Sequence, residues 1–165
     1  MKKLTLLLAV VISTGTVKAQ TERDKEFAKE AAQIGLLEVK LGELAKSKGV
    51  TSAAKDLGGS MVTDHTKANT ELKTLVASKN IPLPTSLSEK GQKEYDKLSK
   101  KEGKDFDKAY THCMVKGHKK AICKFKKEAK KGDDAELKSW ASNTIPALEH
   151  HKEMSKDACK AVQKS

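Results

Sequence analysis

The chain has 165 residues, of which 33 are basic and 22 acidic, so its formal net charge is +11. No stretch approaches about 20 consecutive apolar residues, which excludes a membrane-spanning helix in the mature chain. Arg23 is the only arginine, so the guanidinium forks that bind phosphates and guanine edges are missing, and we expect no specific nucleic-acid recognition.

The first 19 residues have the features of a cleavable signal peptide. Lys2 and Lys3 precede an apolar run from Leu4 to Ile12, and Val17 and Ala19 form a small-x-small cleavage site. We therefore expect cleavage after Ala19 and a mature protein in the periplasm or outside the cell. Residues 20–165 have the length of a single domain and keep a net charge of +8.

Helical periodicity dominates the mature chain. The first helix is predicted from about Asp24 to Ser47, with Gly49 ending it, and the second from Ser52 to about Ser78. The segment from Asn80 to Pro84 stops the second helix, because two prolines within three residues favour an extended connection.

A short extra helix is predicted next. Ser86 and Glu89 form a capping-box pattern that would open it, and it would continue to about Lys100. Gly103 then separates it from the third main helix.

The third main helix is predicted from Lys104 to Lys130, and Gly132 ends it. Asp133 or Asp134 would cap the fourth, which continues to about Val162. Short links between helices indicate antiparallel neighbours. The predicted fold is therefore all-α, with an up-down-up-down four-helix bundle as the simplest topology.

Each main helix has one ionisable residue on its apolar face: Glu38, His65, His118 and His151. With a rise of about 1.5 Å per residue, all four fall within about two turns of one layer near the middle of the bundle. A divalent ion would satisfy them, and three imidazoles with one carboxylate suit zinc, iron, copper or manganese. We predict these four residues as ligands of a transition metal, and a metal-free polar cluster with neighbouring partners is the alternative.

Five further residues bear on this site. Gly117 would permit close helix approach beside His118, and Pro146 is expected to kink the fourth helix before His151. His150 is an alternative ligand whose position off the apolar face predicts exposure. Asp64 is a candidate acceptor for an imidazole N–H. Asp107 lies about 16 Å along the helix from His118, which is too far to ligate the same ion.

Three cysteines, Cys113, Cys123 and Cys159, match no zinc or redox motif. Cys113 and Cys123 are about 15 Å apart along one predicted helix, beyond disulfide reach. Any internal bridge must therefore use Cys159, and the odd number leaves one thiol free or shared between chains.

The sequence resembles a family of exported bacterial proteins with a ferritin-like fold, domain of unknown function 4142. The matching stretches are EVKLGELA from Glu38, MVTDHTKAN from Met61, GKDFDKAY from Gly103 and IPALEHH from Ile145, with His118 between the last two. The resemblance implies a four-helix bundle with recurring positions at Glu38, Asp64, His65, Phe106, Asp107, Tyr110, His118, Pro146 and His151. It implies no established activity. The two Glu-x-x-His motifs of di-iron proteins are absent from core positions, so we expect no oxygen-activating di-iron centre.

Three functions are compatible with these patterns. The favoured one is a non-catalytic exported protein that binds a transition metal. A structural or envelope-interaction protein is the second, because the stretch 116–131 is rich in lysine and would suit an anionic surface. A metalloenzyme with an open coordination position is the third, although no catalytic residue is predicted.

Overall fold

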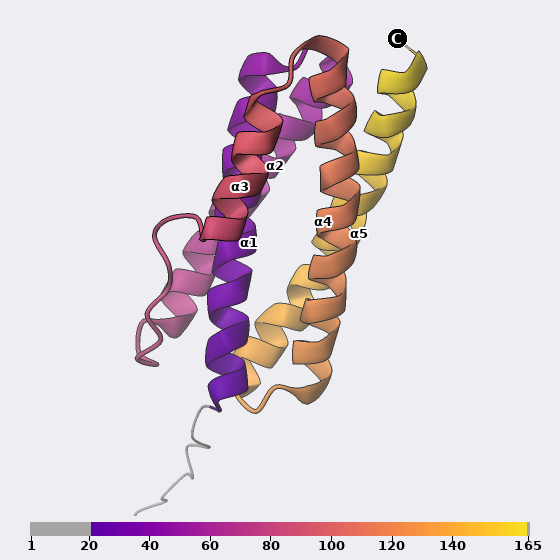
Figure 1. Cartoon of the computed structure of the whole chain (residues 1–165). Coiled ribbons are helices and arrows are strands. Elements are labelled where there is room, and N and C mark those ends of the chain that lie inside the picture. The colour runs from indigo at the N-terminus through magenta and orange to yellow at the C-terminus, as the bar shows by residue number, and fades with distance from the viewer. Residues whose placement is uncertain (1–20, 165) are drawn as a thin grey trace, which may run out of the picture.

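A computed structural model of the protein describes residues 21–164, and every regular element within them is a helix. In chain order they are α1 Glu22–Lys48, α2 Ser52–Val76, α3 Glu89–Ser99, α4 Gly103–Lys131 and α5 Ala135–Lys164 (Figure 1). The all-α prediction, with a short helix before the third long one, is confirmed. The predicted signal peptide lies outside the described residues. Within residues 21–164, no helix combines the length and apolar character needed to cross a membrane.

Local capping signals set where the helices begin. The predicted cap of α3 at Ser86 is wrong, because the Ser88 hydroxyl accepts the Gly91 N–H, whereas the Ser86 carbonyl accepts from the amide of Gln33. Asp134 is the one of the two candidates that caps α5, where its Oδ1 accepts two backbone N–H groups of the first turn.

The long helices do not alternate in direction as the up-down-up-down topology predicted. Asp107, near the start of α4, accepts a backbone N–H from Val50 in the α1–α2 link. Asp24, near the start of α1, accepts the N–H of Asp133 beyond the end of α4. Because α4 starts where α1 ends, the order is up-down-down-up (Figure 1).

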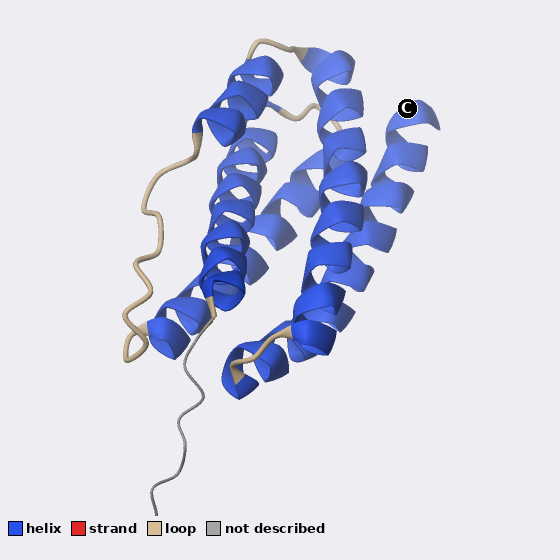
Figure 2. Cartoon of the chain, turned by 60° about the horizontal axis from the view of Figure 1, so that its bottom comes forward, coloured by secondary structure: helices blue, strands red, loops and turns tan. Residues whose placement is uncertain are grey.

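The connection between α2 and α4 explains this correction. A loop leaves the end of α2 and runs along the outside of the bundle, and α3 continues in the same direction (Figure 2). α3 packs against α1 and α4. Together the loop and α3 return the chain to the opposite end of the bundle, so α4 runs parallel to α2.

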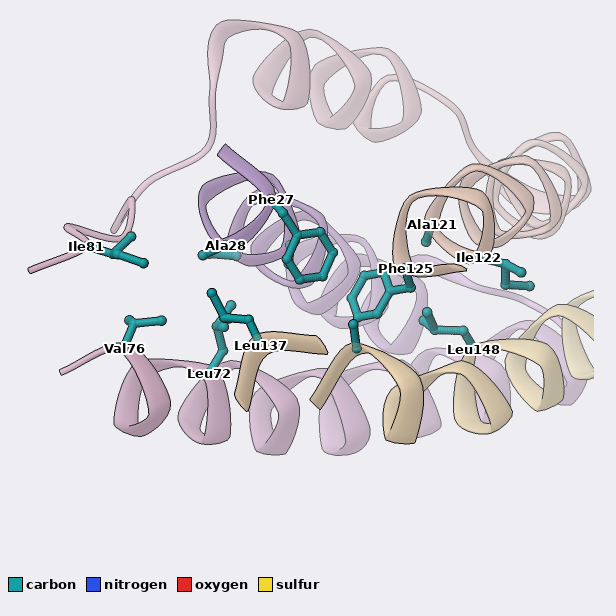
Figure 3. Packing of buried hydrophobic residues seen from close by; sticks show 13 residues of the cluster. Phe27, Ala28, Leu72, Val76, Ile81, Ala121, Ile122, Phe125, Leu137 and Leu148 are labelled. Atoms are coloured by element: carbon teal, nitrogen blue, oxygen red, sulfur yellow. The ribbon is translucent and has the colours of Figure 1, made fainter. Parts of the chain in front are cut away.

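Two apolar clusters form the core at opposite ends of the bundle. The first, shown in Figure 3, includes Phe27, Leu72, Phe125 and Leu137. The second includes Leu41, Met61, Phe106 and Ala158. Since each of the four long helices contributes to both clusters, each one crosses a layer that separates them.

Candidate metal centre

The four residues predicted as ligands occupy that intermediate layer. Glu38 comes from α1, His65 from α2, His118 from α4 and His151 from α5, and none is more than 6% exposed. Along each helix they follow or precede residues of the two apolar clusters. The structure therefore places four ionisable side chains in the interior, where each needs a partner.

The three histidines lie together. One ring nitrogen from each of His65, His118 and His151 lies within 4.8 Å of the other two. The ring centroids are 5.6 Å apart for His65 and His118, and 5.4 Å apart for the other two pairs. Nitrogens bound to one ion at about 2.1 Å lie no more than about 4.2 Å apart, so the cluster is close to the size that a shared ion requires.

Hydrogen bonds orient two of the rings. His118 Nδ1 lies 2.9 Å from the carbonyl oxygen of Met114, one turn earlier on α4. His151 Nε2 lies 2.8 Å from Oδ2 of Asp64 on α2. Both partners are acceptors, so these nitrogens carry the proton, and in the neutral rings His118 Nε2 and His151 Nδ1 carry lone pairs.

One buried nitrogen in each of the three rings has no hydrogen-bond partner among the described residues. His65 Nε2, His118 Nε2 and His151 Nδ1 are buried and unpaired within the described residues. Each buried polar atom without a partner costs about 1–3 kcal/mol. Three such atoms in one cluster disfavour the metal-free alternative, in which neighbours were expected to satisfy each histidine. Lone pairs of this kind are the ligands that a transition-metal ion needs.

Burial keeps the imidazoles of His65 and His118 neutral. Loss of solvation, together with smaller contributions from the nearby His118 and His151 rings, lowers the pKa of His65 to about 3. Burial also lowers the pKa of His118 to about 4, against the opposing effect of its hydrogen bond to Met114. Both rings are therefore available as ligands at neutral and mildly acidic pH, because protons do not compete for their lone pairs.

Glu38 lies at the same height as His65. Gly35 and Gly42 lie on either side of Glu38 in α1. They face Asn69 and Gly58 of α2, and His65 lies between these two residues along α2. Its carboxylate oxygens are nevertheless outside the group of three nitrogens. The structure brings Glu38 into the layer but not into the cluster, and its role as fourth ligand stays a prediction.

A glycine on α4 makes room for the Glu38 carboxylate. A Cβ atom at Gly117 would lie 2.9 Å from Glu38 Oε1, so this glycine makes room for a side chain rather than for the close helix approach that was predicted. Glu38 Oε2 is buried and has no hydrogen-bond partner in the described part of the chain. Burial raises the pKa of Glu38 to about 8, and the carboxyl group is therefore mostly protonated at neutral pH without a cation.

The other residues considered for the site from the sequence lie either beside the three histidines or away from them. Asp64 accepts an imidazole N–H, as predicted, and the donor is His151 of α5. His150 is exposed, as expected from its position off the apolar face. Asp107 binds the α1–α2 link at the end of the bundle, away from the cluster.

Sequence reasoning missed two contributors. The carbonyl of Met114 orients His118, and the i−4 spacing on one helix was a signal that could have identified it. Trp140 lines a cavity of about 50 Å³ that also touches His65 and His151. Its Nε1 is buried without a partner. Nothing in the local sequence links Trp140 to the histidines, because the contact depends on the packing of α5 against α2.

Fold and site together define an all-α protein whose four long helices enclose a buried cluster of three histidines. The family model described as "Domain of unknown function (DUF4142)" matches residues 11–158, and the chain belongs to this family. The resemblance noted from the sequence is therefore confirmed. A comparison with curated proteins gives no match.

Several solved structures share the fold. A DUF305 fragment from Deinococcus radiodurans is 10% identical with a TM-score of 0.75, and the match covers 86% of this chain and 98% of the fragment. CopM in its Cu(II)-bound form is 15% identical with a TM-score of 0.70, covering 84% of this chain and 96% of CopM. Its Cu(I)-bound form is 17% identical with a TM-score of 0.66, covering 81% and 93%.

Proposed function

We propose that this protein is an exported, non-catalytic binder of one transition-metal ion, with His65, His118 and His151 as ligands. The observation that carries the proposal is the convergence of three buried, unpaired imidazole nitrogens from three helices. Glu38 remains the proposed fourth ligand, because it shares the layer and lacks a partner for Oε2. The predicted signal peptide supports an exported location, and the single long crossover supports a ferritin-like bundle.

Copper is the metal that we put first. Imidazole ligands suit copper, zinc and iron, so the ligand set alone leaves the metal open. The similar fold of CopM, which binds copper and silver in its solved structures, favours copper over zinc, iron and manganese. When bound, the ion would accept the lone pairs of the three histidine nitrogens that have no hydrogen-bond partner among the described residues.

Binding without turnover fits the surroundings of the cluster. The cavity that reaches His65 and His151 has room for only a few water molecules, at about 50 Å³. Sites for small-molecule substrates are about 300–1,000 Å³. The metalloenzyme alternative therefore has less support than storage, delivery or sequestration of the ion.

Metal content of purified protein tests this proposal. The mature chain, incubated with equimolar copper, zinc, iron and manganese salts and desalted, is expected to retain one copper ion per chain by elemental analysis. His118→Ala should lose most of the bound metal because it removes one of three ligands. His150→Ala is the matched control, since that exposed imidazole precedes His151 and lies outside the cluster. Wild-type metal content in His118→Ala would sink the proposal.

A further inference from the structure

A cavity reaches the three-histidine cluster from the side of the bundle. It has a volume of about 50 Å³ and is lined by residues of α1, α2, α4 and α5, among them His65 and His151. Both side chains are more than nine-tenths buried, and His65 Nε2 and His151 Nδ1 lack hydrogen-bond partners. The cavity therefore touches two of the three imidazoles that offer lone pairs.

Small side chains form the outer rim of this cavity. Ala68 on α2 is half-buried and Ala147 on α5 is exposed, and both belong to its lining. Because α2 and α5 pack against each other, the methyl groups of these two alanines line adjacent sides of the cavity. A larger side chain at either position would project into the space that leads inward.

Asp64 connects the rim with the cluster. Its side chain is 51% exposed, yet its Oδ2 accepts the Nε2 proton of the buried His151. Asp64 lines the cavity and also an open groove on the surface of α1 and α2. A carboxylate at this place attracts cations from solution. One residue thus contacts solvent, the cavity and a ring of the cluster.

We propose that the metal ion enters and leaves the three-histidine cluster through this cavity, and that Asp64 draws the cation to the rim while it positions His151. The inference rests on the proposed function, because it requires the cluster to bind a transition metal. If the ion enters and leaves by a single route, a side chain that narrows this route slows both steps equally. The association and dissociation rate constants of the ion then fall by the same factor. The dissociation constant then stays unchanged, which separates a residue of the route from a ligand.

Rim variants test the route. Trp140 is the only tryptophan and lines the cavity, so quenching of its fluorescence by copper(II) ions reports their arrival. In stopped-flow measurements Ala68→Leu and Ala147→Leu should slow association by about tenfold, and chelator-induced dissociation by the same factor. Affinity and stoichiometry should equal those of the wild type. Ala161→Leu, exposed on the same helix as Ala147, is the matched control with wild-type rates.

Asp64 variants separate its two roles. Asp64→Asn keeps a carbonyl oxygen for His151 but loses the charge, so association should slow, and added salt should reduce its rate less than it does in the wild type, while stoichiometry is kept. Asp64→Ala should in addition weaken affinity, because His151 is no longer held. Wild-type rates in both leucine variants, in protein that still binds copper, would overturn the route. Absence of copper binding in the wild type would instead overturn the proposed function.

Discussion

The surroundings of Glu38 in the buried layer disfavour its charged form. Its carboxyl group is buried, and among residues 21–164 Oε2 has no hydrogen-bond partner and no cationic side chain contributes to its pKa. Burial alone raises that pKa to about 8. In the unfolded chain the carboxyl group titrates near its model value of 4.5, so folding and proton binding at Glu38 are linked.

The linkage gives a measurable pH dependence in metal-free protein. Between about pH 5 and pH 8 the folded state keeps the Glu38 proton and the unfolded state has lost it, so raising the pH favours unfolding. Glu38→Gln cannot titrate. Relative to the wild type, its free energy of unfolding should therefore rise by about 1.4 kcal/mol per pH unit across this range. Urea unfolding at pH 5, 6, 7 and 8 in the presence of a chelator measures the slope.

The slope is the decisive quantity because it does not depend on any fixed cost of the buried amide. A constant offset between Glu38→Gln and wild type at all four pH values would contradict the assigned burial of the carboxyl group. Glu43→Gln is the control, since that glutamate is exposed on the same helix and its substitution should give no slope.

At the scale of helices, Asp107 shows how a single side chain sets the start of an element. It is fully buried, and its Oδ2 accepts the N–H of Thr51 at 2.8 Å and the Thr51 hydroxyl at 2.6 Å. Oδ1 accepts the N–H of Val50 at 3.2 Å. These bonds tie the first turn of α4 to the α1–α2 link, and they hold α4 at the end of the bundle where α1 finishes.

Replacing this acceptor should destabilise the fold without affecting the site. Asp107→Asn has the same shape, but it exchanges one acceptor oxygen for an NH₂ group that would face backbone donors. We expect a loss of about 2–4 kcal/mol in the free energy of unfolding, measured by urea denaturation. Asp105→Asn, exposed in the same turn, should change it by less than about 0.5 kcal/mol. Copper stoichiometry should be unaltered in both, and equal losses would refute the role of Asp107.

Local signals explain which parts of the elements were predictable. Gly49 and Gly132 directly follow α1 and α4, although both have a negative φ rather than the left-handed cap conformation expected of glycine, and the prolines at 82 and 84 follow α2. The ends of these three helices were therefore predicted within a few residues. The apolar periodicity also placed one histidine on the inner face of each of three helices. These are properties of single helices, and the sequence contains them directly.

Relations between helices were harder to predict. The direction of α4 depends on the end of the bundle to which the connection 77–102 returns the chain. The hydrogen bonds of Asp107 and Asp24 that hold the two ends of α4 join residues more than 50 positions apart. For the same reason the sequence left open which imidazole donates to Asp64. Whether the Glu38 carboxylate turns toward the histidines depends on packing against Gly117, which helical periodicity does not specify.

For the whole molecule, the three cysteines bear on behaviour in an oxidising compartment. All three are free thiols in the structure. Cys113 and Cys159 are partly buried, whereas Cys123 is exposed on α4. Burial, with smaller contributions from nearby Glu38 and Glu94, raises the pKa of Cys113 to about 12, so this thiol forms little of the reactive thiolate. Cys123 is therefore the thiol most accessible to a second chain.

Mild oxidation should join two chains through Cys123. A disulfide requires the two Cα atoms to approach to about 5.5 Å, which an exposed side chain on a helix surface permits between two copies of the protein. We expect a covalent dimer on non-reducing gels for the wild type and for Cys113→Ser, and a monomer for Cys123→Ser. Because Cys123 is exposed and is not one of the three clustered histidines or their hydrogen-bond partners, the dimer should retain one copper ion per chain. Dimer formation by Cys123→Ser at the wild-type rate would show that another thiol forms the bridge.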